Sequence, residues 1–159
     1  MNAAAPVLIA YDGSDAARRA VREAAELFGF RRALVLTVWE PGIAYYSADL
    51  SPAGPDLSPA PVDIEGVHRI EGELRVHAER TAADGLALAK SAGLDAEAVT
   101  VADEVDVADA IVQLAHERRV AAIVIGSRGL SGLRARLEGS TSRAVMKAAP
   151  CPVVVVHDD

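Results

Sequence analysis

The sequence has few aromatic residues and a single cysteine, and both shortages limit what the protein can be. Aromatic residues make up 4% of the 159 residues, so the core must be built from Val, Ile, Leu and Ala. Cys151 has no second cysteine with which to form an internal disulfide, so we expect a reducing compartment, the cytoplasm. The composition, 51% hydrophobic and 25% charged, is that of a globular protein, and the length fits one domain over 1–159.

Long apolar runs and an excess of positive charge are also missing. No apolar stretch approaches the roughly 20 residues that a membrane span needs. The segment Met1–Pro6 lacks the basic and apolar regions of a signal peptide. The formal net charge is -7 at pH 7, and both nucleic acid and anionic membranes favour a basic surface. We therefore expect neither nucleic acid nor a membrane as a partner.

Five short apolar runs alternate with segments of helical periodicity. The expected strands are Val7–Tyr11, Ala33–Trp39, Ala96–Val101, Ala121–Ile125 and Val153–Val156. All but the third are apolar without alternation, which is typical of strands buried on both faces of a parallel sheet. The order of strands and helices predicts an open α/β fold with right-handed crossovers.

The segments between the runs predict four helices. Ser14 or Asp15 can cap the first, and Pro150 ends the last, because proline cannot continue a helix. One stretch, Pro41–Asp63, contains five prolines and no periodicity. We expect it to form a long inserted loop, either a functional lid or a mobile surface insertion.

Two polar segments follow expected strands, where open α/β sheets bind their ligands. Asp12-Gly13-Ser14 comes after the first strand, and Gly126-Ser127-Arg128-Gly129 comes after the fourth. Nine residues later, Gly139-Ser140-Thr141-Ser142 opens the last helix.

The second of these segments and the helix start have the chemistry of an anion site. The glycines permit close backbone approach, and the first N–H groups of the helix, with its dipole, favour an anion. Ser140, Thr141 and Ser142 add hydroxyl donors, and Arg128 adds positive charge in an acidic protein. The alternative is that the glycines serve only turns and a helix cap. Neither GxxxxGK[ST] nor GxGxxG occurs, so neither of those phosphate-binding motifs is present.

The spacing Gly126-x-x-Gly129-(nine residues)-Gly139-Ser140 resembles the G-2x-G-9x-G-[S/T] motif of ATP-binding universal stress proteins. The segments VLIAYDGSDAARRAV and AAIVIGSRGLSGLRARLEGSTSRAVMKAAPCPVVVV also resemble this family. The resemblance implies a Rossmann-like, open five-stranded parallel sheet in the order 3-2-1-4-5 with helices on both faces. It also implies a homodimer through the last strand, Val153–Val156, and a role in nucleotide-dependent stress response or signalling.

The resemblance assigns a role to each matching residue. Asp12 would bind the ribose hydroxyls, although an Asp that begins a turn before a helix is the alternative. Val38 would meet the adenine through its backbone, unless it is simply a core strand residue. The remaining assignments are Ala10 and Tyr11 as walls of the same pocket, Gly126 and Gly129 against ribose and phosphates, Gly139, Ser140, Thr141 and Ser142 on the phosphates, and Arg128 as a candidate phosphate contact.

The expected ligand is ATP, with Mg²⁺ or Mn²⁺ held mainly by its phosphates. The four histidines do not form a metal-ligand pattern, so we expect no metal site made by the protein itself; they are His68, His77, His116 and His157. The sequence shows no well-placed general base or nucleophile, so no catalytic residue is assigned. The alternatives are a slow ATPase or adenylyl-transferring enzyme, and a structural dimer with a vestigial site.

Overall fold

The computed structural model describes residues 4–41, 63–103, 106–127 and 140–157. Strands and helices alternate along them as β1 (Val7–Ala10), α1 (Asp15–Phe28), β2 (Arg32–Trp39), α3 (Ile64–Ser91), β3 (Asp95–Ala102), α4 (Val107–Glu117), β4 (Ala122–Gly126), α5 (Ser140–Ala148) and β5 (Val153–Val156). The five strands and four helices expected from the sequence are all present, and each strand agrees with its expected bounds to within one residue. Most of the expected insertion, 42–62, lies outside the described residues.

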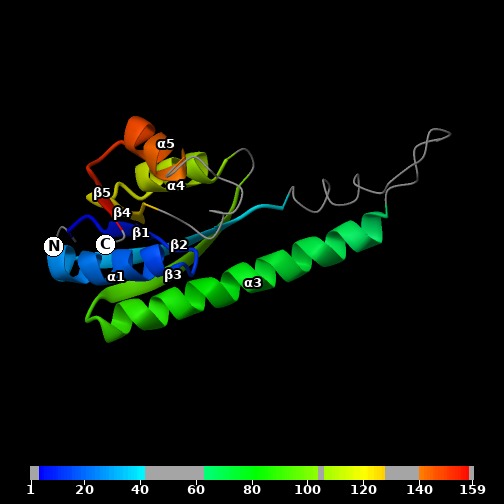
Figure 1. Ribbon diagram of the computed structural model, residues 1–159, viewed down its shortest axis with the longest axis horizontal. Coiled ribbons are helices and arrows are strands. Elements are labelled where there is room, and N and C mark those ends of the chain that lie inside the picture. Colours follow the sequence, from blue (N-terminus) through cyan, green and yellow to red (C-terminus); the bar gives the residue numbers. More distant parts are fainter. Residues whose placement is uncertain (1–3, 42–62, 104–105, 128–139, 158–159) are drawn as a thin grey trace.

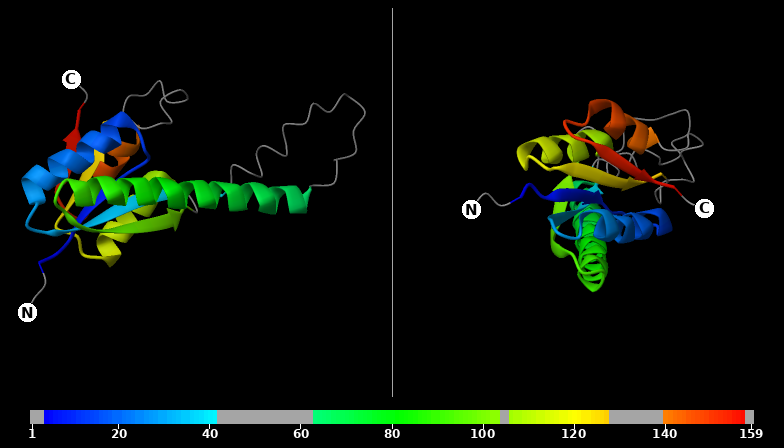
Figure 2. Two further views of the ribbon diagram at one scale, coloured as in Figure 1. Left: turned by 90° about the horizontal axis from the view of Figure 1, so that it is seen from below. Right: turned by 90° about the vertical axis from the view of Figure 1, so that its left-hand side faces the viewer.

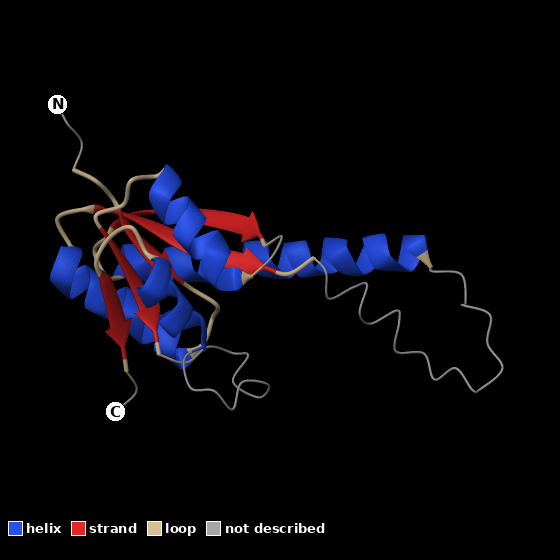
Figure 3. Ribbon diagram, turned by 90° about the horizontal axis from the view of Figure 1, so that it is seen from above, coloured by secondary structure: helices blue, strands red, loops and turns tan. Residues whose placement is uncertain are grey.

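The five strands form one parallel sheet in the order β3-β2-β1-β4-β5, which confirms the predicted fold class. Helices α1 and α3 lie on one face of the sheet, and α4 and α5 lie on the other (Figure 1). Seen from above and coloured by secondary structure, the helices cross over the strands, and the longest helix runs out beyond them (Figure 3). No helix in the described part of the chain is both long enough and apolar enough to cross a bilayer.

The central strands supply both halves of the core. In β1, Val7 and Ile9 pack toward α1 and α3, while Leu8 packs toward α4 and α5, and all three are fully buried. Each fully buried aliphatic side chain contributes about 1.5–3 kcal/mol. Strand β5 differs from the expectation of burial on both faces, because its four valines are only half-buried. The reason is its position at the edge of the sheet, beside β4 alone among the described strands.

Helix α3 is the longest element, with 28 residues. Its carboxyl-terminal half packs on the sheet, and its amino-terminal half extends well beyond the strands (Figure 2). It is capped by Asp63, whose Oδ1 accepts a hydrogen bond from the Gly66 amide at 3.0 Å. The helix therefore covers the β2–β3 side of the sheet and also presents a projecting arm.

Candidate functional site

The residues predicted to bind a ligand gather at the carboxyl edge of the sheet. Strands β1, β2 and β4 are parallel neighbours, so Asp12, Val38 and Gly126 all lie at or near the same edge. The chain must then return to the opposite edge before β5, which runs parallel to β4. Helix α5 makes that return, and its first residue, Ser140, consequently lies on the carboxyl side.

The turn after β1 is built by Asp12 itself. Its Oδ1 accepts a hydrogen bond from the Ser14 amide at 2.9 Å, and Gly13 between them has φ 81°, which favours glycine. The Ser14 hydroxyl then caps α1 by accepting from the Ala17 amide at 3.1 Å. The turn role that the sequence left as an alternative for Asp12 is thus present, and the same turn holds the carboxylate at the edge of the sheet.

Thr37 fixes the start of this turn from the neighbouring strand. Its buried hydroxyl donates to the Tyr11 carbonyl at 2.9 Å, while the Tyr11 amide donates to the Leu36 carbonyl at 2.8 Å. Both main-chain groups of the residue before Asp12 are therefore held by β2. Sequence reasoning did not identify Thr37 as a site residue, although a lone hydroxyl in an apolar strand is a signal, because a buried hydroxyl needs a partner.

Tyr11 and its neighbour Ala10 face opposite sides of the sheet. The Tyr11 ring is 3% exposed and packs on the side of α1 and α3, over Gly85 of α3. Burial raises the pKa of its phenol; the charge of Arg18 opposes that rise, and Asp84 and Asp12 add to it. Ala10 instead packs with Val38 on the side of α4 and α5. A ligand on that side would meet Tyr11 through its main chain.

Gly126 is required by packing, whatever binds beside it. A Cβ at this position would lie 2.8 Å from the carbonyl carbon and the Cβ of Ala16, and 3.0 Å from the Ala16 oxygen. These atoms belong to the first turn of α1, so glycine lets that helix lie against the end of β4. The close approach that the sequence predicted at Gly126 therefore occurs with the protein's own backbone.

The first turn of α5 contains three hydroxyl residues whose exposure to solvent decreases along the chain. Ser140 is exposed, Thr141 is half-buried, and Ser142 is 5% exposed. Ser142 therefore faces the core, and Ser140 and Thr141 are the accessible pair. The other predicted phosphate contacts, Arg128, Gly129 and Gly139, lie outside the described residues.

Acidic groups surround the ends of β2 and β3 at the same edge. Partial burial raises the pKa of Asp103, and the nearby carboxylates of Glu40 and Asp106 raise it further. Within the described residues, no three His, Cys, Asp or Glu side chains are arranged to hold a metal ion. The electrostatic field at the carboxyl edge is therefore negative beside β3, where no ligand was predicted.

Comparison with known proteins identifies relatives over the whole length of the chain. The sequence model of the Universal stress protein family matches residues 5–157. A universal stress protein of Thermus aquaticus is 33% identical over 155 residues, which is 95% of this chain and 97% of that protein.

Two solved structures share the fold. A universal stress protein in complex with cAMP is 26% identical, with a TM-score of 0.65 and coverage of 99% of this chain and 100% of its own. The universal stress protein of Archaeoglobus fulgidus in complex with dAMP is 23% identical, with a TM-score of 0.63 and coverage of 97% and 98%.

Proposed function

The chain belongs to the universal stress protein family, and from this premise we propose that it binds an adenine nucleotide, ATP in particular, at the carboxyl edge of its sheet. The observation that carries this proposal is the convergence of the Asp12 turn, the end of β4 and the first turn of α5 at one edge. The relatives solved with cAMP and dAMP support the same class of ligand.

In this proposal each part of the nucleotide meets a different part of the edge. The phosphates lie at the start of α5, where Ser140 and Thr141 donate hydroxyl and amide hydrogen bonds and the helix dipole favours negative charge. The carboxylate of Asp12 accepts hydrogen bonds from the ribose hydroxyls, which are donors. Ala10 and the main chain of Val38 lie against the adenine, on the face that α5 also occupies.

The bound nucleotide would act as a signal and not as a substrate. A divalent ion, Mg²⁺ or Mn²⁺, would arrive with the phosphates, which supply most of its ligands. We propose that the protein is a cytoplasmic stress-response module and that two copies join through β5, since an edge strand invites pairing. Light scattering that finds only monomer at every concentration would contradict this dimer.

A negative charge introduced at Ser140 tests the phosphate site without endangering the fold. Ser140→Glu places a carboxylate in the first turn of α5, which stabilises a helix but repels a phosphate. Two unit charges about 4 Å apart interact by about 4 kcal/mol near a protein surface, so ATP affinity should fall at least about tenfold. Isothermal titration measures this loss.

The matched control is Ser140→Gln, because Gln has nearly the same shape as Glu and carries no charge. It should retain most of the ATP affinity, and adenosine, which has no phosphate, should bind wild type and Ser140→Glu equally. Equal ATP affinity in all three proteins would show that the phosphates do not lie at α5. Mass spectrometry of ligand released from freshly purified protein identifies the nucleotide, and sustained phosphate release would favour the slow ATPase alternative.

A further inference from the structure

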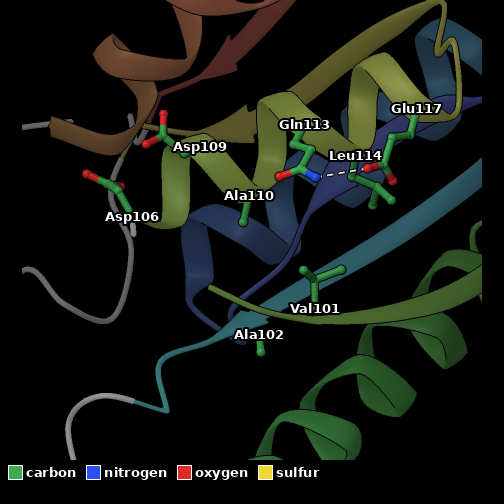
Figure 4. Close-up of a pocket in the computed structure, with 8 residues that line it drawn as sticks. All are labelled: Val101, Ala102, Asp106, Asp109, Ala110, Gln113, Leu114 and Glu117. Atoms are coloured by element: carbon green, nitrogen blue, oxygen red, sulfur yellow. Dashed lines mark hydrogen bonds between the residues drawn. The ribbon is translucent and has the colours of Figure 1, made fainter. Parts of the chain in front are cut away.

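A cleft of about 280 Å³ lies between the edge strand β3 and helix α4, on the face of the sheet that α4 and α5 cover (Figure 4). Its apolar lining comes from both elements: Val101 and Ala102 on β3, and Ala110 and Leu114 on α4. The cleft exists because α4 packs over β2 and the central strands, and leaves this side of β3 only partly covered.

The titratable side chains that line the cleft are all acidic. Asp106 caps the start of α4, Asp109 and Glu117 lie on the helix, and all three are exposed. Gln113 donates to Oε1 of Glu117 at 3.0 Å and so holds that carboxylate along the helix. Beyond the cleft, Arg118 lies 3.8 Å from Glu97 Oε1 and forms an ion pair with it. The cleft therefore combines an apolar floor with a negative rim.

The strand that forms one wall also has an open edge. Strand β3 pairs only with β2 among the described strands, although it is eight residues long. Its outer side therefore carries main-chain N–H and C=O groups that do not bind another described strand, and an edge of this kind can accept an added strand.

We propose that the β3–α4 cleft docks an extended, basic segment of a partner protein. The segment adds to the outer edge of β3 through its main chain. Alternate side chains, Lys or Arg, lay their aliphatic stems on Val101 and Ala110 and place their charges beside Asp109 and Glu117. Charge complementarity selects this occupant, because an acidic segment would be repelled by the rim. Docking here does not depend on nucleotide binding.

The probe is a fluorescent peptide of alternating Val and Lys with the eight-residue length of β3. Fluorescence anisotropy should show saturable binding that weakens as salt rises toward about 0.15 M, because the rim charges are exposed. The same peptide with Glu in place of Lys should not bind. Failure of the Lys peptide to bind even at low salt overturns the proposal.

A pair of charge-matched variants tests the location. Asp109→Asn with Glu117→Gln removes two rim charges and keeps an acceptor for Gln113, and should weaken the peptide roughly five- to tenfold. Glu23→Gln with Glu26→Gln removes the same charge from exposed positions on α1, on the other face, and should leave affinity unchanged. Equal weakening by both pairs means diffuse attraction to an acidic protein and overturns the cleft as the site.

Two further ligands test strand addition. A peptide N-methylated at alternate residues keeps its charges but loses main-chain donors, so it should bind at least several-fold more weakly. Spermine carries positive charge with no peptide backbone and should displace the peptide poorly. If either ligand matches the unmodified peptide, the cleft attracts cations without extending the sheet, and the docking proposal is wrong.

Discussion

Replacement of glycine by alanine at two positions of α3 should change the stability of the protein in opposite directions. Gly72 and Gly85 both lie in the interior of the helix, where Ala is more favourable than Gly by about 0.5–1 kcal/mol. A Cβ at Gly72 meets nothing within 4 Å, so Gly72→Ala should stabilise the protein by about that amount.

At Gly85 the same gain is opposed by a clash. A Cβ there would lie 2.6 Å from Cδ1 of Tyr11 and 2.9 Å from Cγ and Cε1 of the same ring. The ring is buried and cannot swing into solvent, so the added methyl overpacks the core at a typical cost of about 1–3 kcal/mol. Because the gain in helix propensity offsets part of this, Gly85→Ala should destabilise by roughly 0.5–2 kcal/mol.

Urea denaturation followed by circular dichroism, without nucleotide, measures both changes. A thermal melt of the same proteins checks the signs. For a chain of this size each kcal/mol shifts the melting temperature by about 2–4 °C, so Gly72→Ala should melt above wild type and Gly85→Ala below it. If both variants are stabilised equally, the Tyr11 ring does not pack on Gly85.

A double-mutant cycle tests whether the cost of Gly85→Ala arises from its contact with the Tyr11 ring. Tyr11→Leu shortens the side chain and carries its own cost, but in that background Gly85→Ala should recover its helix gain. The coupling between the two positions should therefore reach about 1 kcal/mol or more, as expected of side chains in contact. Additive effects would contradict the contact.

Two more substitutions probe the carboxyl edge. Gly126→Ala should destabilise the ligand-free protein by about 1–3 kcal/mol, because its Cβ meets the Ala16 main chain; unchanged stability in urea would refute that packing role. Asp103→Asn should stabilise at neutral pH, because burial, Glu40 and Asp106 raise the pKa of this acid and so penalise its carboxylate in the folded state. That gain should shrink as pH falls through the raised pKa toward the ordinary value of 3.8, and a pH-independent gain would contradict it.

The strands could be predicted from sequence because each is a short apolar run bounded by turn residues. Val7–Ala10 and Ala122–Gly126 are buried on both faces, and their composition reflects that directly. The strand order came from the family resemblance, since local patterns do not specify which strands are neighbours. The order 3-2-1-4-5 that the resemblance implies already places Val153–Val156 at an edge, and there its valines are only half-buried although their composition is that of a central strand.

The site was predicted unevenly, and the reasons are physical. Consecutive residues of an extended chain face opposite sides, so Ala10 and Tyr11 could have been separated by the alternation alone. The contact between Thr37 and the Tyr11 carbonyl spans 26 residues and requires the register of β1 and β2. The β3–α4 cleft could not be predicted from the sequence, because its lining combines two elements whose packing only the fold defines.

The protein carries one tryptophan, and its position makes it an internal optical probe. Trp39 ends β2, follows Val38 directly, and pairs in register with Ala102 of β3. Its carbonyl accepts from the Asp103 amide at 2.9 Å, so its main chain is held in place. Trp39 is therefore adjacent to Val38, at the proposed adenine position, and in register with Ala102, which lines the β3–α4 cleft. Its emission can follow a nucleotide titration and a peptide titration in one sample, and a shift in one midpoint caused by the other ligand would measure their coupling free energy without any label.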